Sequence, residues 1–443
     1  MSEQGSALTT QADLAAGTGD ASEERSHVPS ANENTHGNSG ATGAMRPIPR
    51  ISIQVFCESS DTGEVFQRAA EDRRLAKAHL TVQMGGIAGA VEYFRESPTP
   101  NLIIVESAEE GERLFAALAQ LAPVCDPSTK VVVIGQTNDI TTYRELIRQG
   151  ISEYLVAPLT PIQVLETISS LYVNRDAPPV GRSLAFIGAK GGVGASVLAH
   201  NVAWCIGERL KEDTVVVDLD LAFGTAGLDF NQDPTQGVAD ALTAPERVDE
   251  VLLERLLVRC TDHLSVFTSP GTLDREFDLD PSAFESVLEV VRRAVPSVVI
   301  DLPHVWSAWS RSVLLDADEI VIVAGPDLAS LRNAKNLVER IKVARPNDNP
   351  PRLVLNMVGM PKRPEIPPKD FADAIGLEPS AVINFEPNLF GTASNNGQML
   401  PEVDKNAAAV KAVEDLAALI TGRSAPAEKK GSFLDRLMGK KSA

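Results

Sequence analysis

Two stretches of the chain alternate short apolar runs with helical segments. In the first, residues 50–176, the apolar runs read ISIQVF, LTVQM, NLIIVES, KVVVIGQ and EYLVAP. Strands that alternate with helices predict βα units and a parallel sheet. We therefore predict an α/β fold, with a doubly wound parallel-sheet domain over residues 50–176.

The second stretch, residues 182–422, repeats this pattern over a greater length. Its apolar runs read SLAFIGA, TVVVDLD, LSVFTSP, SVVIDLP, EIVIVAG, RLVLNMV and AVINFEP. Runs that are apolar at nearly every position are typical of strands covered on both faces. This pattern predicts a second doubly wound parallel sheet.

Three segments outside these domains differ in composition. Residues 1–49 have almost no large apolar side chains and predict a disordered tail, and prolines mark residues 177–181 as a linker. Residues 423–443 form a basic amphipathic tail, with apolar residues on one face of a short helix. That helix would lie on anionic lipid or in a partner's groove, and the alternative is a solvated tail.

Composition and charge narrow the possible functions. A chain of 443 residues is long enough for two domains, and its net charge of −19 disfavours nucleic acid as the main partner. The four cysteines lack the spacing of a zinc site or a metal cluster. The first residues lack a basic leader and an apolar core, so we expect a cytoplasmic protein.

The segment GAKGGVGASV, residues 188–197, lies between a predicted strand and a predicted helix. A glycine loop at a helix N-terminus binds phosphate through free N–H groups and the helix dipole. A P-loop ends in Gly-Lys-Ser/Thr, and its hydroxyl residue holds Mg²⁺. Gly194 and Ser196 fit this pattern, but Ala195 replaces the lysine and the nearby lysine is Lys190. The predicted nucleotide-binding residues of the loop are Gly191, Gly192, Val193, Gly194, Ala195, Ser196 and Val197.

The sequence KGGVGAS resembles the deviant Walker A signature of the ParA/MinD ATPases, KGGxGK[ST]. The resemblance implies ATP and Mg²⁺ as cofactors. It also implies a catalytic role for Lys190, which would cross a dimer interface to contact the partner's nucleotide. Because Ala195 stands in place of the ordinary P-loop lysine, we expect slow or absent hydrolysis.

Other motifs of the same family follow in order. VVVDLDLAFGTAGLDF resembles switch I, which implies that Asp218 lies near Mg²⁺ and that Asp220 orients the attacking water. SVVIDLP resembles the Walker B strand, which makes Asp301 a water-mediated Mg²⁺ ligand beside Ser196. The resemblance of LVLNMV and NFEPN implies two residues at the adenine base, Asn356 and Pro387.

The first domain resembles a response-regulator receiver in the order and spacing of its elements. It departs from that family at the phosphorylation site, where Glu106 ends the third strand and Ala157 replaces the lysine before the last proline. We therefore interpret residues 50–176 as a pseudo-receiver used for docking or dimerisation. The alternative is a flavodoxin-like domain without receiver ancestry.

The two domains together, followed by NFEPNLFGTASNNGQML, resemble the CpaE/TadZ family of tight-adherence (Flp-type) pilus assembly proteins. The resemblance implies an ATP-binding assembly and polar-localisation factor. It would act as a homodimer that recruits pilus secretion proteins to the inner membrane, without nucleic acid. The alternatives are a DNA-partitioning ParA-like ATPase and a scaffold that does not hydrolyse ATP.

Overall fold

The computed structural model describes residues 48–172, 180–274 and 279–423. Within these ranges the chain forms two α/β domains, each described below by itself. Almost all of the predicted N-terminal tail, the first three linker residues and all but the first residue of the basic tail lie outside these ranges. Of the helices described, none is both long and apolar enough to cross a membrane.

The N-terminal domain contains the predicted five-stranded parallel sheet, and its strand order is β2-β1-β3-β4-β5. The strands are β1 (Ser52–Cys57), β2 (His79–Met84), β3 (Leu102–Glu106), β4 (Lys130–Gly135) and β5 (Glu153–Val156). The helices are α1 (Ser60–Ala70), α2 (Gly86–Phe94), α3 (Glu112–Leu121), α4 (Ile140–Arg148) and α5 (Pro161–Tyr172). This strand order is one of the two common doubly wound arrangements.

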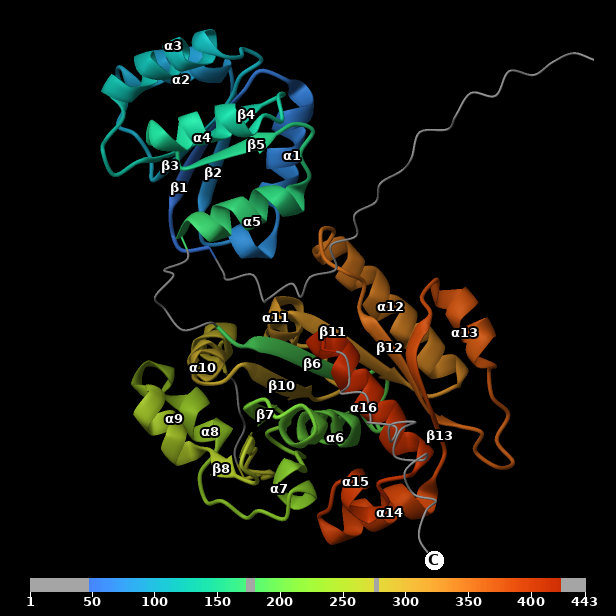
Figure 1. Cartoon of the computed structure of the whole chain (residues 1–443). Coiled ribbons are helices and arrows are strands. Elements are labelled where there is room, and N and C mark those ends of the chain that lie inside the picture. Colours follow the sequence, from blue (N-terminus) through green and yellow to red (C-terminus); the bar gives the residue numbers. More distant parts are fainter. Residues whose placement is uncertain (1–47, 173–179, 275–278, 424–443) are drawn as a thin grey trace, which may run out of the picture. The chain divides into compact units, whose positions relative to one another are not determined.

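Helices cover both faces of this first sheet (Figure 1). Successive side chains of a strand point to opposite faces, so each strand feeds two cores. Val55 of β1 packs in the core under α1 and α5, together with Phe66 and Leu165. Its neighbour Phe56 packs on the other face, under α2, α3 and α4, with its ring 5.5 Å from that of Phe94.

The C-terminal domain contains an eight-stranded sheet in the order β13-β12-β11-β6-β10-β7-β9-β8. Its strands are β6 (Arg182–Gly188), β7 (Thr214–Asp218), β8 (Val258–Arg259), β9 (Leu264–Phe267), β10 (Ser297–Leu302), β11 (Glu319–Ala324), β12 (Arg352–Val358) and β13 (Pro379–Asn384). Seven of them are parallel and match the predicted runs. The eighth strand, β8, pairs antiparallel with β9 at one edge and is not among the predicted runs. A strand of two residues has no periodicity that a sequence pattern could show.

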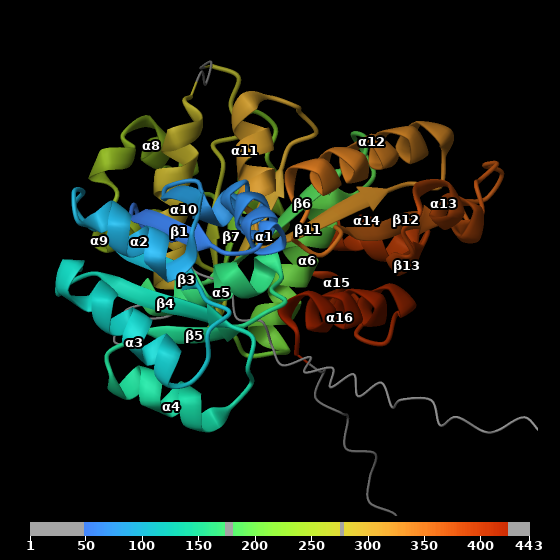
Figure 2. The ribbon, with the colours of Figure 1, turned by 90° about the horizontal axis from the view of Figure 1, so that it is seen from above.

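Two helical layers enclose this second sheet (Figure 1). One face is covered by α6 (Ala195–Glu208), α7 (Ala226–Asp229), α14 (Pro387–Asn396), α15 (Leu400–Val403) and α16 (Ala408–Thr421). The other is covered by α8 (Val238–Thr243), α9 (Glu250–Leu256), α10 (Pro281–Ala294), α11 (Ala308–Asp316), α12 (Leu328–Ala344) and α13 (Pro368–Ile375). Figure 2, seen from above, also places α16 alongside α6.

The chain changes direction across the sheet at β6. From β6 it runs outward through β7 to β9, returns to β10 beside β6, and then continues through β11 to β13 on the other side. In open α/β sheets, ligands bind at the carboxyl ends of the strands where the order reverses. The glycine loop follows β6 and therefore lies at this position.

Candidate nucleotide-binding site

The start of the glycine loop is fixed by both strands beside β6. On the β10 side, Nδ1 of His304 lies 2.8 Å from the carbonyl oxygen of Gly188. On the β11 side, the N–H of Ala189 donates to the carbonyl of Val323 at 2.7 Å. The side-chain amide of Asn333 on α12 donates to the carbonyl of Ala189 at 2.8 Å. These contacts set the loop's path before any ligand binds.

Left-handed backbone at two glycines forms the turn itself. Gly192 and Gly194 have φ angles of +79° and +83°, which residues with a side chain rarely adopt. A Cβ on Gly194 would also lie 2.7 Å from Nδ2 of Asn356, which donates to the carbonyl of Val193 at 2.9 Å. The structure thus places Asn356 beneath the loop, buried and holding it in place, and its contact with adenine stays a prediction.

Helix α6 begins in the loop and leaves N–H groups free for an anion. The first intrahelical bond runs from Leu198 to the carbonyl of Gly194, so the N–H groups of the preceding turn have no partner inside the helix. Gly194 at the N-cap has no side chain to bind them. The hydroxyl of Ser196 has no hydrogen bond to any residue that the structure describes. This end of α6 can therefore bind a phosphate, with a hydroxyl beside it for a metal ion.

Two buried carboxylates lie side by side next to this helix. Asp218 of β7 and Asp301 of β10 are register partners and face α6. The carboxylate of Asp218 accepts hydrogen bonds from the N–H groups of Asp220 and Ala226, at 3.0 and 3.1 Å, and from Oγ of Ser269, at 3.0 Å. Burial and the neighbouring charge of Asp301 raise the pKa of Asp218 above its usual range. Asp218 thus anchors the segment after β7.

Asp301 differs from Asp218 because one of its oxygens has no partner. The residue is 1% exposed, and its Oδ1 makes no hydrogen bond to any described residue. An unpaired carboxylate oxygen is costly to bury unless a further group binds it. Mg²⁺ prefers oxygen ligands and keeps several waters, so a hydrated ion held by Asp301 and Ser196 fits these donors. Bound there, Mg²⁺ would neutralise negative charge on a nucleotide's phosphates.

The segment after β7 folds back over Asp218. Asp220 accepts the N–H of Phe223 on Oδ1 at 3.0 Å, and its carbonyl accepts the N–H of Gly224 at 2.7 Å. A Cβ at Gly224 would overlap the carboxylate of Asp218 and the hydroxyl of Ser269, so only glycine fits this close approach. The proposed role of Asp220 in orienting water stays a prediction.

Pro387, the second residue expected at the base, is the first residue of α14, directly after β13. Proline suits the first helical position because its fixed φ matches the helix and no donor is lost there. Its packing against a base also stays a prediction.

Lys190 turns toward its own chain and pairs with Asp327. Its Nζ lies 2.7 Å from Oδ2 of Asp327, and the two side chains are 40% and 25% exposed. Asp327 also caps α12, accepting the N–H of Ser330 on Oδ1 at 2.9 Å. Burial alone would raise the pKa of Asp327, but the bonds from Lys190 and Ser330 outweigh it and lower the pKa. Lys190 must leave this pair before it can contact another chain.

Sequence reasoning missed a buried histidine on α6. His200 is 0% exposed, with Nδ1 2.7 Å from Oδ2 of Asp229 and Nε2 3.5 Å from Oδ2 of Asp301. Burial alone would lower the pKa of His200, but the two carboxylates outweigh it and raise the pKa to about 10. One signal was present, since a polar ring interrupts the apolar face of VLAHNVAW.

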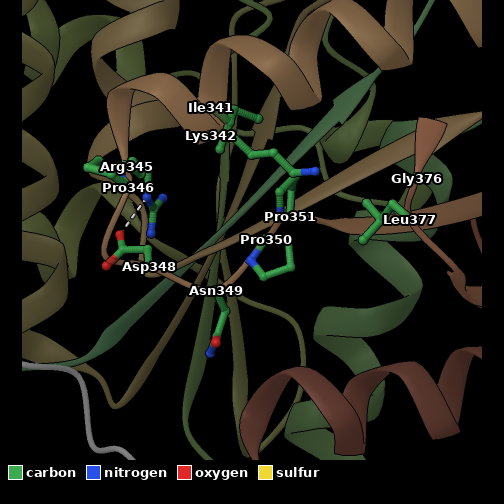
Figure 3. Close-up of a pocket in the computed structure, with 10 residues that line it drawn as sticks. All are labelled: Ile341, Lys342, Arg345, Pro346, Asp348, Asn349, Pro350, Pro351, Gly376 and Leu377. Atoms are coloured by element: carbon green, nitrogen blue, oxygen red, sulfur yellow. Dashed lines mark hydrogen bonds and ion pairs between the residues drawn. The ribbon is translucent and has the colours of Figure 1, made fainter.

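A hollow of about 260 Å³ lies near the amino end of β12, away from the glycine loop (Figure 3). It is lined by the ends of α12 and α13 and by the proline-rich connection before β12. Arg345 on its wall donates to Asp348 at 2.6 Å and to the carbonyl of Ala317 at 2.7 Å. Because this guanidinium is already engaged, the hollow is a poorer candidate than the loop for binding a phosphate.

In the N-terminal domain, Glu106 occupies the end of β3 and is enclosed by hydrogen-bond donors. The N–H groups of Glu58 and Ser59 donate to its Oε2 at 2.8 and 2.9 Å. The hydroxyl of Thr62 donates to Oε1 at 2.8 Å, and the hydroxyl of Ser59 also lies 2.8 Å from Oε1. Burial alone would raise the pKa of Glu106, but these bonds outweigh it and lower the pKa. This carboxylate holds the start of α1 and is not free to act as a nucleophile.

Comparisons with known proteins give different relatives for the two domains. A pilus assembly protein CpaE from Caulobacter crescentus is 49% identical, over 29% of this chain and 98% of the solved chain, with a TM-score of 0.29. A ParA family ATPase from Chlorobium tepidum is 24% identical, over 53% of this chain and 98% of the solved chain, with a TM-score of 0.49. The septum site-determining protein MinD of Synechocystis is 25% identical over 161 residues, which are 36% of this chain and 59% of that protein.

The extent of these matches limits what each one shows. The chain spans about three fifths of the length of the curated relatives it matches, 59% and 61%. No protein-family model matches it. The Caulobacter protein, in contrast, is matched over nearly its whole solved length at high identity, through the N-terminal region of this chain. The chain therefore belongs to the CpaE family of pilus assembly proteins.

Proposed function

We propose that this protein is an ATP-responsive assembly and localisation factor for Flp-type pili. It binds Mg²⁺-ATP at the glycine loop and dimerises across the nucleotide. The dimer recruits pilus secretion proteins to a cell pole at the inner face of the membrane. Family membership supports the pilus role, and the site at the end of β6 supports the nucleotide.

The observation that carries the nucleotide proposal is the buried, unpaired Oδ1 of Asp301 beside the open end of α6. An anion at α6 and a hydrated cation at Asp301 would satisfy both at once. In a scaffold that binds no ligand, this buried unpaired oxygen would destabilise the fold without any compensating contact. We therefore favour nucleotide binding over the scaffold without a ligand.

Exposed apolar residues near the loop support the dimer. Phe223, Val305, Trp306 and Leu328, the apolar rim, are 49–72% exposed and follow the carboxyl ends of β7, β10 and β11. Large exposed apolar residues that gather at one site often mark a protein interface. The rim lies at the same edge of the sheet as Lys190, so a second copy could cover both.

The oligomeric state of the full chain tests this function directly. Sedimentation velocity is measured in Mg²⁺ with ATP, with ADP and without nucleotide. A dimer should form in the ATP sample and not in the other two. A chain that stays monomeric and does not bind ATP at millimolar concentration would contradict the proposal. A DNA-partitioning ATPase would instead shift duplex DNA in a salt-dependent way, which we do not expect from a chain with a net charge of −19.

We further propose that the N-terminal domain is a docking module without phosphorylation chemistry. Glu106→Gln is expected to destabilise it by about 2 kcal/mol, because the new NH₂ group faces donors and leaves an N–H of the α1 start unpaired. Urea unfolding of a fragment of residues 48–172 measures this. The matched region makes up 98% of the solved chain of the Caulobacter relative, which supports the use of this fragment.

The pH dependence of the same fragment gives a second test of Glu106. Its pKa is lowered in the folded state, so its stabilising effect is complete above the unfolded value of about 4.3 and is lost as the pH falls through the folded value. The Gln variant should lose less stability between pH 5 and pH 3 than the wild type. Glu58→Gln is a matched control, since Glu58 is exposed and accepts one N–H, from Ala108. Equal acid sensitivity of Glu106→Gln and wild type would refute the role of Glu106.

All but the first residue of the basic tail lies outside the described residues, and we propose that the tail anchors the protein to a surface. Deleting residues 429–443 is expected to abolish binding to vesicles that contain anionic lipid, because the lysines and the apolar face act together. Affinity for ATP should stay unchanged. Co-sedimentation with vesicles and cellular localisation measure the effect, and unchanged results in both would show that the tail is not an anchor.

A further inference from the structure

The buried histidine of α6 is not used by the proposed nucleotide site, yet both of its ring nitrogens face carboxylates. Nδ1 lies 2.7 Å from Asp229 and Nε2 lies 3.5 Å from Asp301. The ring of His200 is fully buried and packs against Phe230, with 5.6 Å between the ring centroids. A side chain enclosed in this way keeps one orientation, so the ring forms a fixed bridge between the two acids. It is hydrogen-bonded at Asp229, and at Asp301 it makes an ionic contact, since Nε2 has no hydrogen bond to a described residue.

The bridge ends on the short helix that closes the segment after β7. We call residues 219–229 the switch segment. At the start of α7 the N–H of Ala226 donates to Asp218 at 3.1 Å. At the end of α7, Oδ2 of Asp229 accepts hydrogen bonds from Nδ1 of His200, at 2.7 Å, and from the hydroxyl of Thr225, at 3.1 Å. The switch segment is thus held at one point by Asp218 and at another by His200.

We propose that His200 is a positioning residue that couples magnesium at Asp301 to the conformation of the switch segment. The inference rests on the proposed function, since it requires Mg²⁺-ATP at this site. Oδ1 of Asp301 is the unpaired oxygen, whereas Oδ2 faces the imidazole. Partners of this kind fix the orientation of a carboxylate that serves a metal ion, and losing them typically weakens metal binding.

The geometry gives the direction of the coupling. At 3.5 Å the Asp301 contact is longer than an ordinary hydrogen bond, whereas the Asp229 contact at 2.7 Å is short. Magnesium that draws Oδ1 into its hydration shell would also fix Oδ2 against Nε2. The ring would then be held from both sides, and α7 would be held with it. Magnesium would order the switch segment through His200, without touching that segment.

Two substitutions separate the two halves of the bridge. His200→Asn places an amide nitrogen near the position of Nδ1 and keeps the Asp229 contact but not the Asp301 contact. His200→Gln reaches toward the position of Nε2 and keeps the Asp301 contact but not the Asp229 contact. Asp229→Asn weakens the same Asp229 contact from the other end, in case a change at the buried histidine prevents folding.

The experiment uses the full chain and two binding readouts. A fluorescent ATP analogue, titrated over a series of Mg²⁺ concentrations, gives the Mg²⁺ half-saturation, and hydrogen exchange of residues 219–229 gives the protection that Mg²⁺-ATP adds. His200→Asn should raise the half-saturation about 10- to 100-fold. His200→Gln and Asp229→Asn should keep it within a few-fold but lose the added protection. Affinity without Mg²⁺ should not change in any of them.

Asn201→Ala is the matched control, because Asn201 is also buried on α6 but accepts the N–H of Leu400, at 2.7 Å, away from Asp301. It should lower stability and leave both readouts as in wild type. If the His200 variants behave like this control, the inference is overturned but the proposed function is not. A wild-type chain that does not bind the ATP analogue at all would overturn the proposed function and this inference with it.

Discussion

Replacing Lys190 by alanine is expected to remove the ATP-dependent dimer while leaving the affinity of a single chain for ATP almost unchanged. The proposed target of this lysine is the nucleotide of the opposite chain. Truncating one partner of a buried charge pair costs about 2 to 5 kcal/mol, and a twofold dimer has two such contacts. The dimer dissociation constant should therefore rise about 10³-fold or more.

Sedimentation velocity with ATP and Mg²⁺ measures this change. Lys335→Ala is a suitable control, because Lys335 is exposed on α12 of the same domain. The substitution removes the same charge as Lys190→Ala. It should dimerise as the wild type does. If Lys190→Ala dimerises equally well, the lysine is only a solvated residue at the edge of the loop.

The pair between Lys190 and Asp327 sharpens this test. In the single chain the lysine is bound to Asp327, so the proposed dimerisation would first have to break that contact. A partly exposed ion pair contributes about 1 kcal/mol or less, and the dimer must break two of them, so Asp327→Asn should tighten the dimer by up to about 30-fold. Asparagine can still cap α12, which keeps the helix start intact. The two variants should thus change dimerisation in opposite directions.

The strands and the glycine loop could be predicted because the signals for them are local. An apolar run between turn residues marks a buried strand, and the spacing of the glycines after β6 requires a tight turn before α6. The position of Asp301 at the end of a strand was equally local. Parallel strands carry such residues to one edge of the sheet, so their proximity to the loop followed from the fold class.

Contacts between residues far apart in the sequence could not be predicted. Asp327 is 137 positions from Lys190, and Asn356 is 163 positions from the carbonyl that it binds in the loop. No short pattern links such residues, because only the packing of α12, β11 and β12 on one side of β6 brings them together. The sequence did show Glu106 in place of the receiver aspartate. It could not show that α1 encloses that carboxylate with donors.

The wild-type chain is expected to bind Mg²⁺-ATP and to hydrolyse it slowly. Binding should survive because, in the proposed site, the free N–H groups of α6 and the Ser196 hydroxyl would provide most of the contacts to the phosphates and the metal. Hydrolysis should be slow, because the methyl group of Ala195 cannot place a positive charge where negative charge develops on the phosphates. Losing one preorganised electrostatic group typically costs about 10²-fold or more in rate.

Ala195→Lys should therefore raise ATP turnover about 10²-fold, by returning a cation to the first turn of α6. Ala195 is only partly buried, so a longer side chain can extend into the mouth of the loop. Single-turnover phosphate release measures the rate, and Ala195→Met is the matched control with similar length and no charge. Methionine should leave turnover as slow as in wild type, because added bulk alone does not stabilise phosphate charge. Fast Mg²⁺-dependent turnover by the wild type, or equal rates for both variants, would show that the missing lysine does not limit hydrolysis.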